Sequence, residues 1–171
     1  MIYYLIASIL IAVAALFART KRAVLAAGIL FYAVQIAAAG LLLWGGLYDT
    51  TSAAFFTFDA LGTLFYLLLV VVSMYVFGHS EAYLQGEDLR SYRLYFALLM
   101  LLTTAIAGAY FANNLAVTWI FLEATTLCSA GIIYHRRTAQ ALEAAWKYVF
   151  VCSTGIAMAY LGILLLSLIH I

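Results

Sequence analysis

Six long apolar segments, separated by short polar stretches, account for most of this 171-residue chain. Each segment is close to the ~20 residues that an α-helix needs to cross the hydrocarbon core of a bilayer. Because the backbone finds no water to bond inside a bilayer, segments this apolar and this long are expected to be helical. The sequence therefore predicts an all-α integral membrane protein with six transmembrane helices. The expected helices cover residues 2–18, 24–44, 57–77, 94–112, 115–134 and 142–165.

The amino-acid composition agrees with a membrane protein. Hydrophobic residues make up 68% of the chain, 9% are charged, and there is no proline, whereas soluble domains are about one-quarter charged. A formal net charge of +1 gives no reason to expect a nucleic-acid partner. The two cysteines, Cys128 and Cys152, fall inside expected helices without a neighbouring Cys or His cluster. Neither a disulfide, a metal site nor a cofactor is expected.

The basic residues of the connecting segments predict the orientation in the membrane. Seven Lys and Arg residues lie in the segments after the first, third and fifth expected helices, and none lies after the second or fourth. Positive charge collects on the cytoplasmic side. We therefore expect a prokaryotic inner membrane protein with its N-terminus on the periplasmic side and its basic loops in the cytoplasm. Aromatic residues near the helix ends fit an interfacial anchoring belt. They are Tyr3, Tyr4, Trp44, Tyr48, Tyr92, Tyr95 and Tyr134.

Glu123 is the leading candidate for a functional residue because it lies near the middle of the fifth expected helix. It stands about eleven residues from the cytoplasmic end, which is roughly 16 Å at ~1.5 Å per residue. A carboxylate at this depth must be protonated, paired with a cation, or in contact with a hydrated cavity. Each state makes Glu123 a candidate proton carrier. The alternative is a neutral glutamic acid that bonds a neighbouring helix.

Three further titratable residues extend the predicted proton pathway. Lys147 lies about five residues inside the sixth expected helix, one turn after Glu143, and this Glu-before-Lys spacing favours an ion pair. Lys147 is either a proton relay or a residue whose long stem reaches the cytoplasmic interface. His135, at the end of the fifth expected helix, is either a proton-transfer group at the cytoplasmic entrance or a solvated interfacial residue. The predicted pathway comprises Glu123, Lys147, Glu143 and His135, and no catalytic residue is assigned.

The other polar residues have structural interpretations. Asp59 is expected to cap the third helix, and the Asn-Asn step at 113–114 suits a tight turn. The segment 78–93, which includes His79 and Glu81, is expected to be a solvated loop. Five hydroxyl residues in the fifth and sixth helices either support a chain of waters or permit close helix packing. They are Thr125, Thr126, Ser129, Ser153 and Thr154.

Two runs of sequence carry a family resemblance. Residues 95–130 read YFALLMLLTTAIAGAYFANNLAVTWIFLEATTLCSA, and residues 141–162 read ALEAAWKYVFVCSTGIAMAYLG. Both resemble the antiporter-like membrane subunits of respiratory complex I and its relatives. Within that group, EATTLCSA and ALEAAWKYV are most similar to component F of hydrogenase-4, a membrane subunit of group 4 nickel-iron hydrogenases of the formate hydrogenlyase type. The resemblance covers about residues 55–165 and is strong over 94–165.

The resemblance implies a larger architecture than six helices. The family fold has roughly fourteen helices with two inverted repeats, and Glu123 aligns with the glutamate of its fifth helix, while Lys147 aligns with a sixth-helix lysine. The broken seventh helix and the second repeat have no counterpart here, so we expect an N-terminal fragment. Residues 1–93 would hold the first three helices and a cytoplasmic loop, and 94–165 the start of the proton-channel repeat. Residues 166–171, LSLIHI, match a translated sequencing adapter and are expected to be an adapter-derived tail.

The function that the resemblance implies is that of a truncated proton-translocating subunit. The complex would be a membrane-bound hydrogenase or an NADH-quinone oxidoreductase-like assembly, with the redox centres in partner subunits. Partners would be other membrane subunits, peripheral redox subunits and the lipid bilayer. Two alternatives remain open at this point. One is a subunit of a multisubunit sodium/proton antiporter, and the other is a six-helix membrane scaffold that transports nothing.

Overall fold

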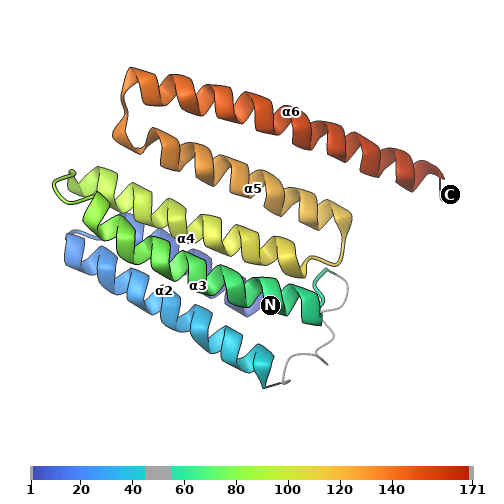
Figure 1. Ribbon diagram of the computed structural model, residues 1–171, viewed down its shortest axis with the longest axis horizontal. Coiled ribbons are helices and arrows are strands. Elements are labelled where there is room, and N and C mark those ends of the chain that lie inside the picture. Colours follow the sequence, from blue (N-terminus) through green and yellow to red (C-terminus); the bar gives the residue numbers. More distant parts are fainter. Residues whose placement is uncertain (1, 45–54, 170–171) are drawn as a thin grey trace.

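The computed structural model describes residues 2–44 and 55–169, and within them the chain is almost entirely helical (Figure 1). The helices are α1 (Ile2–Phe17), α2 (Lys21–Leu43), α3 (Ala60–Tyr83), α4 (Leu89–Phe111), α5 (Leu115–Ile133), the short 3-10 helix η1 (Tyr134–Arg136) and α6 (Ala139–Ile169). Helices α2 to α6 are long and apolar enough to cross a membrane, whereas α1 is apolar but has only 16 residues. The expectation of an all-α, multi-pass membrane protein is confirmed at this level.

Helix α4 is central to the bundle, because it contacts α1, α2, α3 and α5. Two clusters of buried side chains run along it: one includes Phe31 and Phe96, the other Tyr66 and Phe111. Among the described elements, α6 contacts only α5 and η1, and Figure 1 shows it at the edge of the bundle. The molecule is thus a packed body of α1 to α4 with the α5–α6 pair laid against α4.

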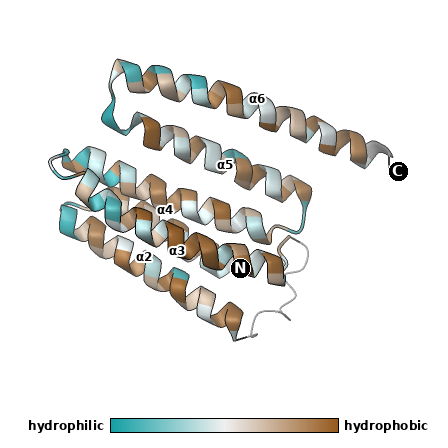
Figure 2. Cartoon of the chain, in the orientation of Figure 1, coloured by the Kyte–Doolittle hydropathy of each residue, from teal (hydrophilic) through white to brown (hydrophobic). Residues whose placement is uncertain are grey.

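Polar residues gather at the end of the bundle that carries the α1–α2, α3–α4 and α5–α6 connections (Figure 2). We call this end the basic end, since the expected cytoplasmic arginines and lysines lie there. The side chain of Thr20 accepts a hydrogen bond from the backbone N–H of Ala23 at 3.2 Å and caps α2. Helix α2 therefore begins at Lys21, three residues before the expected start.

The expectation of a long solvated loop over 78–93 is wrong. Helix α3 continues to Tyr83 and α4 begins at Leu89, so that His79 and Glu81 are exposed residues on the last turns of α3. The chain reverses instead in a short connection that contains Gly86 at φ 94, a conformation that glycine adopts at little cost. Hydropathy marks where a helix leaves the apolar layer, but not where its hydrogen bonding ends.

Helix α6 is longer than the expected span of 142–165. It begins at Ala139, where the Thr138 hydroxyl accepts a bond from the N–H of Ala141 at 3.0 Å, and it continues to Ile169. The first part of the segment 166–171 is thus helical, as its apolar sequence favours, and 170–171 lie outside the described residues. The adapter origin of this tail stays a prediction.

At the opposite end, the expected turn and cap residues act as predicted. Asp59 accepts a hydrogen bond from the N–H of Gly62 at 3.1 Å and caps α3. Asn114 accepts one from the N–H of Ala116 at 2.8 Å and caps α5. An isolated antiparallel bridge between Phe56 and Ala112 ties the segment before α3 to the α4–α5 turn.

The residues of the predicted aromatic belt differ in exposure, and the belt itself stays a prediction. Tyr3 and Trp44 are about nine-tenths exposed near helix ends, as an interfacial position requires. Tyr92, however, is only 3% exposed and packs within the first of the two buried clusters. The hydroxyl of Tyr4 likewise bonds inside the bundle, and Tyr48 lies outside the described residues.

The closest packing between α4 and α5 generates a first prediction. A β-carbon at Gly108 would lie 2.3 Å from a ring carbon of Phe121 on α5, whereas one at Gly78 on α3 would meet nothing within 4 Å. We expect Gly108→Ala to lower the thermal denaturation midpoint, because overpacking costs about 1–3 kcal/mol. Gly78→Ala should leave it unchanged or raise it, since alanine favours a helix by up to ~1 kcal/mol. Equal midpoints for the two variants in the same detergent would contradict the α4–α5 contact.

Candidate functional site

Glu123 lies on the side of α5 that faces α6. Its side chain is half-buried, and the hydroxyl of Ser153 on α6 donates a hydrogen bond to Glu123 Oε1 at 3.0 Å. Glu123 is the ninth of the 19 residues of α5, so it stands near the middle of the helix. The carboxyl group therefore lies at an interface between two helices that are each long enough to span a membrane.

No cation lies at ion-pair distance from Glu123 within the part of the chain that the structure describes. The ion pairs there are Arg136 with Glu87 and Lys147 with Glu143. The carboxyl group of Glu123 thus has a neutral hydroxyl as its hydrogen-bonding partner from α6. A hydroxyl both donates and accepts, and it can therefore bond the carboxylate and the carboxylic acid alike.

Lys147 and Glu143 form the ion pair that their spacing predicts, with Lys147 Nζ 2.5 Å from Glu143 Oε1. Their side chains are 75% and 66% exposed, on the face of α6 that points away from α5. Lys147 precedes Ser153 by six residues, which separates the two side chains by about 120° around a helix and about 9 Å along it. The structure therefore does not bring Lys147 next to Glu123.

One turn before Glu123 on α5, the side chain of Trp119 contacts α6. The indole N–H of Trp119 donates to the backbone carbonyl of Ile156 at 3.3 Å, and its ring packs on that of Tyr160 with the centroids 4.6 Å apart. Trp119 thus packs between the two helices. Together with the Ser153 bond, these contacts fix which faces of the two helices meet.

The other hydroxyls of α5 and α6 bond their own helices. Thr125 and Thr126 both donate to the carbonyl of Leu122, at 2.7 and 3.1 Å, and Thr154 donates to that of Phe150 at 2.6 Å. Their hydroxyl protons are therefore not directed toward Glu123. Of the two interpretations of these residues, close packing is favoured for these three, and Ser153 is the hydroxyl that reaches the carboxyl group.

A shallow groove runs along α6, and the Ser153 that bonds Glu123 is one of its lining residues. Its volume is about 440 Å³, and its lining includes Ser153 together with Trp146, Phe150 and Met158. Ser153 thus both lines this groove and donates a hydrogen bond to Glu123. The sequence alone did not indicate this groove.

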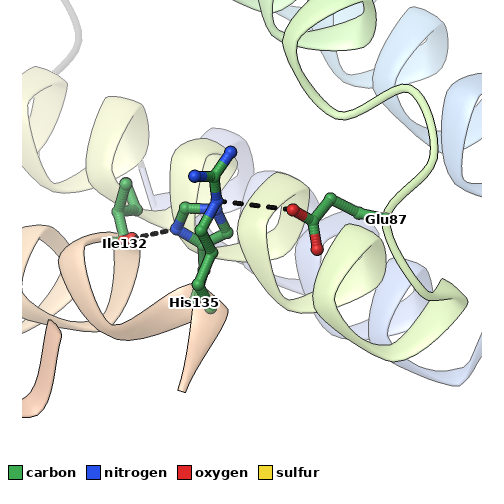
Figure 3. A network of polar contacts seen from close by, with 4 residues as sticks. Glu87, Ile132 and His135 are labelled. Atoms are coloured by element: carbon green, nitrogen blue, oxygen red, sulfur yellow. Dashed lines mark hydrogen bonds and ion pairs between the residues drawn. The ribbon is translucent and has the colours of Figure 1, made fainter. Parts of the chain in front are cut away.

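His135 is buried at the basic end rather than solvated. It is only 6% exposed, its ring lies between those of Tyr83 on α3 and Tyr95 on α4, and its Nδ1 is 2.7 Å from the carbonyl oxygen of Ile132 (Figure 3). Of the two alternatives for His135, the solvated interfacial residue is contradicted, because side chains of α3 and α4 enclose the ring; its place in a proton pathway stays a prediction. Twelve residues separate His135 from Glu123, and the structure does not bring them together.

Charged residues beside His135 tie the α5–α6 connection to the rest of the bundle. Arg136 Nε lies 3.3 Å from Glu87 Oε1, and its guanidinium group is 5.1 Å from the ring centroid of Tyr83. Lys21 Nζ donates to the backbone carbonyl of Glu87 at 2.7 Å. Glu87 therefore joins α2, the α3–α4 connection and the end of α5. Sequence analysis missed this role, since Glu87 lies far from its partners along the chain.

The enclosure of His135 generates a prediction about local stability. His135→Ala removes the ring that Tyr83 and Tyr95 pack against, so the connection that carries Arg136 and Arg137 should open more often. We expect trypsin to cleave the detergent-solubilised protein after these two arginines several-fold faster. The control is His79→Ala, which removes an exposed histidine from α3. Equal cleavage rates in the two variants and the unaltered protein, followed by mass spectrometry, would show that His135 anchors nothing.

Comparison with known proteins finds similarity to part of one curated relative. The relative is the hydrogenase-4 component F homolog of Methylacidiphilum infernorum (isolate V4), which is 30% identical over 115 residues. The aligned region covers 64% of this chain and 24% of the relative, so the chain spans about a quarter of the relative's length. No family model matches the chain, and no solved structure matches it significantly. The chain is thus similar to a portion of a hydrogenase-4 component F homolog, which supports the resemblance to antiporter-like membrane subunits at the level of the family.

Proposed function

We propose that this chain is part of a membrane subunit of a complex I-related, hydrogenase-type assembly, and that Glu123 carries protons in it. The proposal rests on the similarity to the hydrogenase-4 component F homolog and on five helices among the described residues that are long and apolar enough to cross a membrane. The single observation that carries the role of Glu123 is its hydrogen bond with Ser153 between two such helices.

The geometry of the Glu123 site suits a group that gains and loses a proton. An ionised carboxylate at membrane depth is costly unless it is paired or hydrated. Glu123 has Ser153 as its partner from α6, and this hydroxyl can donate to the carboxylate or accept from the acid without moving to a new position. The groove beside Ser153 gives a second group, water or a cation from a neighbouring helix, a short approach to the carboxyl group.

Lys147 and Glu143 would act on a different face of the same helix. A charged pair that faces hydrocarbon is costly, so we propose that further membrane protein covers this face of α6 in the assembly. The pair would then relay protons between the cytoplasmic side and the groove that reaches Ser153. We assign His135 to anchoring the α5–α6 connection, because its ring is enclosed far from Glu123.

The rest of the assembly follows from the same proposal. Under this proposal, α4 to α6 belong to the first of two inverted repeats in a fold of roughly fourteen helices. The basic end would face the cytoplasm of a prokaryotic cell. Redox chemistry would take place in peripheral partner subunits, and other membrane subunits would contact the exposed face of α6. The protein would couple electron transfer in those partners to proton movement through Glu123.

Replacing the carboxyl group tests the proposal directly. In the complex that contains the full-length protein, Glu123→Gln should sharply lower the number of protons moved per electron transferred, since an amide cannot take up a proton. The matched control is Glu81→Gln, which removes an exposed carboxylate from α3 and should change nothing. Undiminished proton movement in Glu123→Gln would overturn the role of Glu123. Movement that needs sodium ions in place of electron transfer would favour the antiporter alternative.

Removing the hydrogen bond from Ser153 should slow proton translocation only in part. Ser153→Ala leaves Glu123 in place but removes its partner, and a bond of about 0.5–1.5 kcal/mol corresponds to a change of up to about tenfold in rate. We expect proton translocation to slow by a few-fold to tenfold, without being abolished. Thr154→Ala is the control, because Thr154 bonds the backbone of its own helix. A loss in Thr154→Ala equal to that in Ser153→Ala would indicate a general disturbance of α6.

A further inference from the structure

We propose that α1, α2 and α3 enclose an internal site that binds a water molecule between Gln35 and Ser8. This site shares no residue with the Glu123 site and does not depend on the proposed function. It lies within the span, because Gln35 is eight residues before the end of α2 at Leu43 and fourteen after its start.

Gln35 is the centre of a buried polar cluster. Its side-chain oxygen accepts hydrogen bonds from the hydroxyl of Tyr4 on α1 at 2.5 Å and from that of Tyr66 on α3 at 2.7 Å. The Tyr66 hydroxyl also lies 3.2 Å from the backbone carbonyl oxygen of Gln35. Gln35 has no exposed surface, and Tyr66 is 1% exposed. Three helices therefore meet at one amide group.

Two polar atoms of this cluster have no partner among the described residues. They are Nε2 of Gln35 and Oγ of Ser8, and both residues are completely buried. Exchanging the two ends of the Gln35 amide would not remove the deficit, since the other end would then lack a partner. A buried polar atom without a hydrogen-bond partner destabilises the fold, so both atoms favour a polar ligand.

Ser8 differs from the other buried serine and threonine residues of the described chain. Each of the others donates to a carbonyl of its own helix or helix cap. They are Thr63, Ser73, Ser80, Thr103, Thr104 and Thr126. Ser8 makes no such bond, and it lies one turn after Tyr4 on α1. Its hydroxyl is thus available to a ligand inside the cluster.

Water matches the chemistry that these two atoms require. Buried waters in proteins make about three hydrogen bonds to groups that are otherwise unsatisfied. A water here would accept a bond from the Gln35 amide and exchange one with the Ser8 hydroxyl, with a tyrosine hydroxyl oxygen as the third neighbour. An apolar occupant would leave both atoms unsatisfied, and an ion would lack an opposite charge among the residues of the cluster.

Hydroxyl-radical labelling in ¹⁸O water tests the site, because radiolysis of a bound water oxidises the side chains next to it. The full-length protein in lipid nanodiscs would be irradiated and the oxidation of each tyrosine measured by mass spectrometry. Tyr32 is the matched control: it is a buried tyrosine whose hydroxyl donates to the carbonyl of Ser73, and it is slightly more exposed than Tyr66. Exposure alone predicts faster labelling of Tyr32, whereas a bound water predicts labelling of Tyr66 several-fold faster.

Two variants separate the water from other causes. Gln35→Leu and Ser8→Ala each remove one ligand atom, and we expect both to reduce the labelling of Tyr66 toward that of Tyr32. The comparison of the two tyrosines needs no variant, so it holds even if Gln35→Leu fails to fold. Labelling of Tyr66 no faster than that of Tyr32 would overturn the proposal, as would faster labelling that persists unchanged in Ser8→Ala.

Discussion

A bilayer supplies no water to polar groups, and the positions of most polar side chains in the described part of the chain agree with that constraint. The hydroxyls of buried threonines and serines donate hydrogen bonds to backbone carbonyls of their own helices. Charged residues lie mostly at the basic end. There the backbone carbonyl of Glu87 accepts a hydrogen bond from Lys21, and its carboxylate pairs with Arg136. The carboxyl group that remains at mid-helix, that of Glu123, is bonded across to the neighbouring helix. An ionisable carboxyl group is costly at membrane depth, and its presence there indicates a functional role.

Helices α1 to α4 are packed more extensively than the α5–α6 pair. Helices α1 to α4 share two buried clusters, whereas α6 is attached through α5 and η1. The enclosed ring of His135 fixes the α5–α6 connection at the basic end, and the Trp119 contacts fix the two helices beyond Glu123. Between these anchors, Ser153 bonds Glu123 and also lines the groove on α6. The arrangement leaves the face with Lys147 and Glu143 open to further protein.

Hydropathy predicted the existence and order of all six helices, because the apolar layer requires long uninterrupted segments. It could not predict their ends, since those depend on local hydrogen bonds such as the Thr20 cap of α2. Depth along α5 was enough to single out Glu123. The partner Ser153, the separate face of Lys147 and the burial of His135 depend on how each helix is rotated against its neighbours. The nearly uniform apolarity of α5 and α6 carries no signal for that rotation.

The central claim is that Glu123 takes up and releases a proton at the α5–α6 interface. Infrared difference spectroscopy of the full-length protein in lipid, with ¹³C-labelled glutamate, observes the carboxylic acid group directly as the pH is changed. The account predicts a carboxylic acid band that shifts on ¹³C labelling, changes position in Ser153→Ala and is absent in Glu123→Gln. A spectrum in which no band is lost in Glu123→Gln would contradict the account, because Glu123 would then keep one protonation state throughout.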